Sequence, residues 1–132
     1  MTLLTLDHCA IRTAQLDLTI DFYTGVLGLV DGDRPGFPFP GAWLYLGDKP
    51  VIHLIGVEDA DATVDHSAGG TGAIDHIAFH GTGLAQMRAR LAELGIAWRD
   101  LTVPDLGLQQ VFLKDPNGIT VEINYAADEA LD

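Results

Sequence analysis

The chain has 132 residues, of which 48% are hydrophobic, so it can form one compact domain with a hydrophobic core but not two independent domains. Its 19 acidic and 7 basic residues give a formal net charge of −12, which repels phosphate groups and argues against nucleic-acid and membrane partners. The single cysteine, Cys9, excludes an intramolecular disulfide, and no secretory signal or long apolar run is visible, so we expect a soluble, cytoplasmic protein.

The first half of the chain predicts a strand, an amphipathic helix and three further strands. Apolar residues recur with helical spacing after the first strand, and the pattern ends at Gly28, because glycine tolerates the left-handed conformation that stops a helix. A Gly-Asp-Lys-Pro turn then separates two apolar runs, which is typical of a hairpin. In chain order, these elements are expected near residues 6–11, 16–28, 29–30, 42–46 and 51–55.

The second half of the chain repeats this order of elements. The sequence Leu-Asp-His-Cys-Ala-Ile at residues 6–11 resembles Ile-Asp-His-Ile-Ala-Phe, which begins 68 residues later. An Asp-Pro-Asn-Gly turn again separates the last two apolar runs. The second set of elements is expected near residues 74–79, 84–95, 97–98, 110–114 and 119–124.

Together these elements predict an α+β fold built from two βαβββ modules. The modules are expected to span residues 1–57 and 72–126, within a single domain that covers residues 1–132. Residues 57–73 are rich in acidic residues and glycine, which predicts an exposed connector. Residues 128–132 are expected to fray, as chain ends often do.

Four polar side chains are candidates for a shared site. Strand alternation places His8, His76 and Glu122 opposite the apolar faces of their strands, whereas His53 lies in a run that is apolar on both faces. The repeat puts His8 and His76 at equivalent points, and the hairpins match His53 with Glu122 to within one residue. If the polar faces converge, one divalent cation satisfies all four buried groups. The alternative is that His53 is a hydrogen-bonded core histidine and Glu122 a surface residue.

The type of ligand indicates the type of metal. Imidazole and carboxylate groups favour one divalent ion such as Zn²⁺, Ni²⁺, Fe²⁺, Co²⁺ or Mn²⁺ over Ca²⁺. Two or three histidines and one glutamate leave coordination positions for substrate or water, as a catalytic site requires. The other two histidines lack such pairing, so we expect His66 on the surface of the connector and His80 at the end of a strand.

Four motifs carry a resemblance to a known family. They are Leu-Asp-His-Cys-Ala-Ile, Asp-Phe-Tyr-Thr-Gly-Val-Leu-Gly, Asp-His-Ile-Ala-Phe and Asp-Pro-Asn-Gly, which begin at residues 6, 21, 75 and 115. The chain resembles the vicinal oxygen chelate superfamily, which includes glyoxalase I, methylmalonyl-CoA epimerase, extradiol dioxygenases and fosfomycin thiol transferases. The resemblance implies a curved mixed sheet around a metal site, a small-molecule substrate and a homodimer. It also implies that His8, His76 and Glu122 bind the metal, while His53 stands where glyoxalase I usually has Glu and the epimerase Gln.

The resemblance further implies a metal-dependent lyase or isomerase of the glyoxalase I or epimerase type. Such an enzyme isomerises or cleaves a small oxygen-chelating substrate through a metal-stabilised enediolate, with Glu122 as the catalytic residue that moves the proton. An extradiol-type ring-cleaving dioxygenase is the second interpretation, although Phe112 stands where those enzymes have a tyrosine. A non-catalytic drug-binding module similar to the bleomycin resistance proteins is the third, although such modules usually lack the full set of ligands.

Several side chains are candidates for contact with the substrate. Arg12 follows His8 by four residues, where the glutathione-type glyoxalase I has an arginine that holds a substrate carboxylate; a solvent-facing arginine is the alternative. Val57 does not match the asparagine of the same enzymes. The aromatic, proline-rich residues 33–41 predict an apolar wall or lid, or else a rigid loop packed on its own module. The aromatic candidates for substrate contact are Phe37, Phe39, Trp43, Tyr45 and Phe112.

Overall fold

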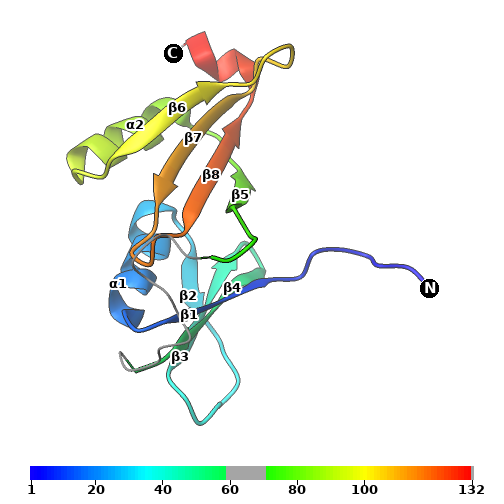
Figure 1. Ribbon diagram of the computed structural model, residues 1–132, viewed down its shortest axis with the longest axis vertical. Helices are drawn as coiled ribbons and strands as arrows, with labels where there is room; N and C mark the ends of the chain where they lie inside the picture. Colours follow the sequence, from blue (N-terminus) through cyan, green and yellow to red (C-terminus); the bar gives the residue numbers. More distant parts are fainter. Residues whose placement is uncertain (59–70, 132) are drawn as a thin grey trace. The chain divides into compact units, whose positions relative to one another are not determined.

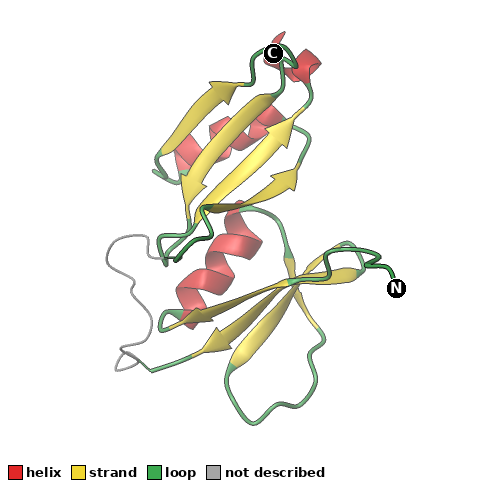
Figure 2. Cartoon of the chain, turned by 45° about the vertical axis from the view of Figure 1, so that its right-hand side comes forward, coloured by secondary structure: helices red, strands yellow, loops and turns green. Residues whose placement is uncertain are grey.

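The computed structural model describes residues 1–58 and 71–131, which fold into two compact units. Each unit has the order βαβββ and a four-stranded mixed sheet of its own, so the predicted α+β class with two βαβββ modules is confirmed (Figure 1, Figure 2). The prediction of a single domain over residues 1–132 stays a prediction. Residues 59–70 of the connector, which include His66, and Asp132 lie outside the described residues.

The first module has its apolar sheet face covered by the helical segment that follows the first strand. Its elements are β1 (Cys9–Thr13), α1 (Leu16–Asp21), the π-helical turn η1 (Phe22–Val26), β2 (Val30–Gly32), β3 (Gly41–Leu46) and β4 (Lys49–Gly56). The strand order is β1-β4-β3-β2, with β1 parallel to β4 and the other pairs antiparallel. Ile11, Leu44 and Leu54 of the strands are buried, as are Tyr23 and Val26 of the helical segment, and α1 contacts β3 and β4. Alternate residues of a strand point to the same face, which gives each strand one apolar face.

The helix predicted over residues 16–28 consists of two different segments. α1 ends at Asp21, and the backbone continues as the π-helical turn η1. A π-helical turn accommodates one more residue than an α-helical turn, and Gly25 within it is a poor helix former. The segment still ends at Gly28, whose φ of 82° is the left-handed conformation expected of a glycine stop. Among the described residues, no helix is long and apolar enough to cross a membrane.

The second module repeats the arrangement, with α2 on one face of its sheet (Figure 2). Its elements are β5 (His76–His80), α2 (Leu84–Glu93), β6 (Trp98–Thr102), β7 (Gln109–Lys114), β8 (Thr120–Tyr125) and the 3₁₀ helix η2 (Ala127–Leu131). The strand order is β5-β8-β7-β6, with β5 parallel to β8. Leu91 of α2 is fully buried, as are Val111 of β7 and Val121 of β8, so these side chains form the core of the module.

The described part of the chain end contacts α2, while the fraying expected of residues 128–132 stays a prediction. Glu129 lies in η2, and its Oε1 accepts hydrogen bonds from the backbone N–H groups of Gly83 at 2.8 Å and Leu84 at 3.0 Å. N–H groups at the start of a helix have no intrahelical acceptor, and the glycine N-cap has no side chain to provide one. The Glu129 carboxylate therefore connects the tail to the start of α2.

The strand registers place two candidate ligands at equivalent points of the two sheets. In the first module, His53 lies opposite Ala10 of β1. In the second module, Glu122 lies opposite Ala78 of β5. Since Ala10 and Ala78 are equivalent residues of the repeat, His53 and Glu122 are structurally matched, which removes the one-residue ambiguity of the sequence comparison.

Candidate functional site

Three stacked rings lie on the polar face of the first sheet. His8 directly precedes β1, and its ring stacks on that of His53 with centroids 3.7 Å apart and planes inclined by 10°. Trp43 lies opposite His53 on β3, and the two rings stack with centroids 4.1 Å apart. Because β1 and β3 flank β4, the His53 ring is held between its two neighbours, and this stacking fixes its plane.

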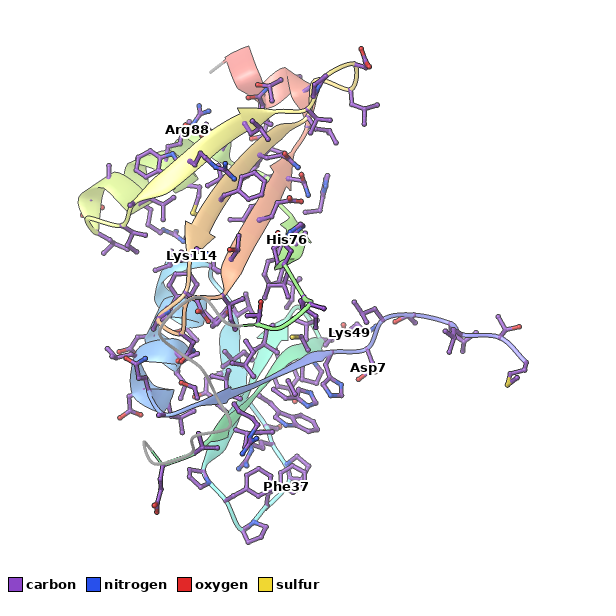
Figure 3. The ribbon with its side chains drawn as sticks, in the orientation of Figure 1. Asp7, Phe37, Lys49, His76, Arg88 and Lys114 are labelled. Carbon is purple, nitrogen blue, oxygen red and sulfur yellow. The ribbon has the colours of Figure 1, made fainter. Side chains whose placement is uncertain are left out.

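Further aromatic side chains lie in the loop between β2 and β3, where Phe37 is labelled in Figure 3. The Phe37 centroid lies 6.4 Å from that of Trp43 and 5.2 Å from that of Phe39. The Arg34 guanidinium lies 5.1 Å from both phenyl centroids, and its Nη2 donates a hydrogen bond to the Phe39 carbonyl at 2.9 Å. Phe37 and Phe39 remain 42% and 40% exposed, so this aromatic wall of Phe37, Phe39 and Trp43 is open to solvent. Sequence reasoning missed Arg34, although it lies within the same proline-rich segment.

Tyr45 and Arg12, the other residues of the first module predicted to contact a substrate, do not belong to the aromatic wall. The Tyr45 hydroxyl donates a hydrogen bond to the Asp33 carbonyl at 2.7 Å, and a Cβ on Gly32 would lie only 2.8 Å from the Tyr45 ring. Tyr45 therefore holds the start of the loop against β3. Arg12 is exposed on β1, opposite Ile55 of β4. Contact between either side chain and a substrate stays a prediction.

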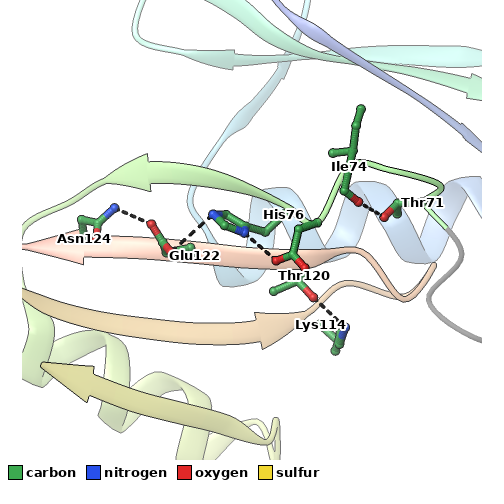
Figure 4. A network of polar contacts seen from close by, with 8 residues as sticks. Thr71, Ile74, His76, Lys114, Thr120, Glu122 and Asn124 are labelled. Carbon is green, nitrogen blue, oxygen red and sulfur yellow. Dashed lines mark hydrogen bonds and ion pairs between the residues drawn. The ribbon is translucent and has the colours of Figure 1, made fainter. Parts of the chain in front are cut away.

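In the second module, Glu122 is a buried carboxylate, only 8% exposed. Its Oε1 lies 3.5 Å from Nε2 of His76, and its Oε2 accepts a hydrogen bond from Nδ2 of Asn124 at 2.8 Å (Figure 4). Oδ1 of Asn124 in turn accepts a hydrogen bond from Nε2 of Gln110 at 2.9 Å. The alternative of Glu122 as a surface residue is therefore wrong. Both amides were missed from the sequence, although Asn124 follows Glu122 by two residues and so shares its strand face.

Phe112 lies between this carboxylate and a cationic side chain in the strand register. It lies opposite Glu122 on β7, and its ring is 6.4 Å from the His76 ring with planes inclined by 85°. The Arg99 guanidinium lies 4.9 Å from the Phe112 centroid. His80, at the end of β5, is exposed, as expected of a strand-end residue.

The histidines at the start of the two modules make the same hydrogen bond to the preceding residue. Nδ1 of His8 lies 2.7 Å from Oδ2 of Asp7, and Nδ1 of His76 lies 2.8 Å from Oδ1 of Asp75. Since an ionised carboxylate can only accept, Nδ1 carries the proton, and Nε2 of the neutral ring keeps its lone pair. A carboxylate in this position is typical of histidines that bind a metal through the other nitrogen.

His53 uses the opposite nitrogen. Its Nε2 lies 3.0 Å from the Pro50 carbonyl, so Nε2 carries the proton and Nδ1 keeps the lone pair. Burial, followed by the charge of His8, lowers the pKa of His53 below its ordinary value of 6.5. The hydrogen bond to Asp75 instead raises the pKa of His76. His53 is therefore neutral at pH 7, the form in which imidazole binds a metal.

The donors in each module fit a divalent cation by their chemistry. The first module has two imidazoles and the second has an imidazole and a carboxylate, the ligand types that Zn²⁺, Ni²⁺, Fe²⁺, Co²⁺ and Mn²⁺ accept. Within residues 1–58 and 71–131, no group of three or more His, Cys, Asp or Glu side chains suited to a metal ion is assembled. The predicted four-ligand centre of His8, His53, His76 and Glu122 thus stays a prediction.

The sequence of this chain is similar to known proteins over most of its length. The family model described as the Glyoxalase/Bleomycin resistance protein/Dioxygenase superfamily matches residues 5–123. A protein named Glyoxylase I 4 from Arabidopsis thaliana is 31% identical over 124 residues, which cover 92% of this chain and 70% of that protein.

Solved structures share the fold of this chain. A lactoylglutathione lyase from Agrobacterium tumefaciens matches with 24% identity and a TM-score of 0.67, covering 92% of both chains. The fosfomycin resistance protein FosX from Listeria monocytogenes matches with 13% identity and a TM-score of 0.71, covering 97% of this chain and 98% of the other. At these identities the likeness concerns the fold alone.

Proposed function

Because the chain belongs to the Glyoxalase/Bleomycin resistance protein/Dioxygenase superfamily, we propose that it is a divalent-metal-dependent enzyme of the glyoxalase I or epimerase type. In this proposal it isomerises or cleaves a small molecule that chelates through two oxygen atoms. His8 and His53 of the first module and His76 and Glu122 of the second are its metal ligands, within one chain or between the chains of a cytoplasmic homodimer.

One observation carries this proposal: the duplicated Asp–His pair. Asp7 and Asp75 each hold Nδ1 of the following histidine, at 2.7 Å and 2.8 Å, and both pairs lie at the start of the parallel strand pair of their module. One such pair on its own does not distinguish a metal ligand from a histidine with a purely structural role. Two pairs at repeat-equivalent positions, each leaving an Nε2 lone pair, support ligands that are oriented for a cation.

The ion would contribute Lewis acidity, which stabilises negative charge on the substrate oxygens. The proton transfer belongs to Glu122. Its Oε2 is occupied by Asn124, whereas its Oε1 has only the 3.5 Å contact with His76. In the proposed reaction, Glu122 would release the ion, and its Oε1 would accept the proton from the substrate carbon and return it to the neighbouring carbon.

Exchange of the substrate carbon proton with solvent deuterium tests this role. Hemithioacetals and acyl-CoA thioesters are the substrates to screen. Catechols are included to detect dioxygenase activity. Phe112 argues against that activity, because its side chain lacks a hydroxyl. Glu122→Gln should abolish exchange while leaving metal bound, because the amide keeps the shape but cannot take the proton. His80→Gln, a change at an exposed histidine of the same module, should leave exchange intact. Unchanged exchange in Glu122→Gln would exclude Glu122 as the base.

A non-catalytic drug-binding module is the second candidate, and the exposed aromatic wall of Phe37, Phe39 and Trp43 favours it. Metal analysis of protein purified without chelator separates the two functions. The enzyme should retain about one divalent ion per chain, since its site needs a resident cation. Protein that contains far less metal, but binds flat aromatic compounds, would support the binding module instead.

A further inference from the structure

Two cationic side chains lie on the face of the second sheet that carries His76 and Glu122. Arg99 of β6 lies opposite Phe112 of β7, which lies opposite Glu122. Lys114 belongs to the neighbouring row, opposite Thr120 of β8, which in turn lies opposite His76 of β5. Residues that lie opposite one another in paired strands project to the same face of the sheet, so both cations share the face of the candidate ligands.

Neither cation has an acidic partner among the described residues. The Arg99 guanidinium rests over the Phe112 ring, and Nζ of Lys114 donates a hydrogen bond to Oγ1 of Thr120 at 2.6 Å, seen beside His76 (Figure 4). Arg88 of α2, by contrast, pairs with Asp100 at 3.1 Å. In a chain with 19 acidic residues and a net charge of −12, two cations without a carboxylate partner are available to a ligand from outside.

The two cations line one shallow pocket, which we name the cation pocket. It has a volume of about 310 Å³, and Phe112 and Thr120 also line it. Because Thr120 Oγ1 accepts the hydrogen bond of Lys114, its own O–H remains a donor. The pocket therefore offers three donors, two of them charged, next to an apolar ring, a combination that recognises a small organic anion.

We propose that the cation pocket binds a carboxylate or phosphate group of the substrate and thereby positions its reacting carbon near Glu122. The positioning of a substrate rests on the proposed function, whereas the binding of an anion to the pocket does not. This anchor differs from Arg12, which lies in the other module and is the arginine expected from the sequence. Lys114 and Arg99 are positioning residues in this proposal, since they hold the anionic end of the ligand and not its reacting atoms.

Binding of simple anions to the metal-free protein, kept in chelator, tests the pocket. Phenyl phosphate and benzoate serve as the anionic probes, with benzyl alcohol as the neutral analogue, and titrations followed by NMR report both affinity and location. We expect at least one of the anions to bind and to shift the signals of Phe112 and Thr120, and benzyl alcohol not to do so. Whichever anion binds more tightly identifies phosphate or carboxylate as the preferred group. Binding should weaken as salt is raised, because both charges are exposed to screening.

Variants then assign the binding to the two cations. Arg99→Gln and Lys114→Gln should each weaken it about tenfold through loss of a charge-assisted hydrogen bond, and Lys114→Arg should keep most of it. Arg88→Gln is the matched control, because it removes one positive charge from the same module but from a residue paired with Asp100. Equal weakening by Arg88→Gln, or no preference of the wild type for either anion over benzyl alcohol, would overturn the proposal.

The same variants keep this inference separate from the proposed function. If the cation pocket is real but the chain is no metal enzyme, anion binding persists and no metal is retained. If the enzyme is real but the pocket is not, Arg99→Gln and Lys114→Gln leave both anion binding and KM unchanged. A rise in KM with little change in kcat in these two variants supports the anchor role within the enzyme.

Discussion

The two modules share strand order and register, yet they hold their matched residues by different means. His53 in the first module lies between the rings of His8 and Trp43, whereas Glu122 in the second module is held by Asn124. The residue matched to Asn124 is Ile55, which has no polar side chain. A neutral imidazole tolerates an apolar setting, but a buried carboxylate requires hydrogen-bond donors. One backbone plan thus accommodates two kinds of candidate ligand through a few neighbouring side chains.

The largest expected effect follows the removal of His8 or His76, the two histidines at equivalent positions of the repeat. His8→Ala and His76→Ala should each lower the affinity for Zn²⁺ or Co²⁺ by more than about 100-fold, because each removes a proposed metal ligand. Removal of an outer partner alone costs about 10- to 100-fold. Isothermal titration of the metal into chelator-free protein measures this. His80→Ala should bind metal like the wild type. If only one module's histidine affects affinity, the two modules do not share a cation.

The next largest effect concerns the amide support of the second module, which is the side-chain amide of Asn124 that donates to Glu122. Asn124→Ala leaves Oε2 of the buried Glu122 without its donor, which should cost about 1–3 kcal/mol of stability. Metal affinity should fall about tenfold, since the carboxylate is no longer held in place. Gln110→Ala, one step further from the carboxylate, should have a smaller effect on both quantities.

The control for the amide support lies at the matched position of the other module. Ile55→Val changes an apolar side chain there and should leave metal affinity unaltered. Urea unfolding and metal titration together make the comparison. Equal affinity losses in Asn124→Ala and Ile55→Val would show that the amides do not position Glu122.

The histidines should titrate in opposite directions from their ordinary pKa of 6.5. The pKa of His53 should lie below this value because of burial, and that of His76 above it because of Asp75. Trp43→Leu should raise the pKa of His53 by exposing it, and Asp75→Asn should lower that of His76. NMR titration of metal-free protein measures each value; a His53 pKa that is insensitive to Trp43 would contradict the stacking argument.

The sign of the pH dependence also differs between the modules. The folded state favours neutral His53, so its contribution to stability is present above pH 6.5 and is lost as the pH falls through the lowered pKa. The folded state favours protonated His76, so its contribution is present below pH 6.5 and is lost as the pH rises through the raised pKa. Unfolding curves of Trp43→Leu and Asp75→Asn across this range separate the two contributions.

The smallest effect concerns the helix starts. Glu129 accepts two N–H bonds at the start of α2, whereas in the first module the N–H of Gln15 bonds to Oγ1 of Thr13. Glu129→Ala should therefore destabilise the protein by about 1 kcal/mol, a typical cost of losing a helix cap. Asp128→Ala, at the exposed neighbouring residue, is the control for urea unfolding. No difference between the two variants would show that the tail does not stabilise α2.

Local patterns in the chain were sufficient for the fold class and for the matching of the two modules. The repeated Asp-His motif and the glycine stop at Gly28 are read from neighbouring residues, and the structure bears out the elements that they predict. The π-helical turn after Asp21 was not predictable, because apolar spacing does not distinguish it from a regular helix. The contact of Glu129 with α2 was likewise hidden, because it joins residues 45 and 46 positions apart.

The sequence by itself determined the two βαβββ modules and the four candidate ligands at matched positions, because strand alternation and an internal repeat depend only on spacing along the chain. Only the tertiary structure decided how these ligands are held. The contact of Glu122 with His76, the ring stack around His53 and the position of Arg99 over the Phe112 ring all arise from strand pairing. Pairing brings together residues that are distant in the chain, and their contacts set burial, charge and the lone pairs left for a ligand.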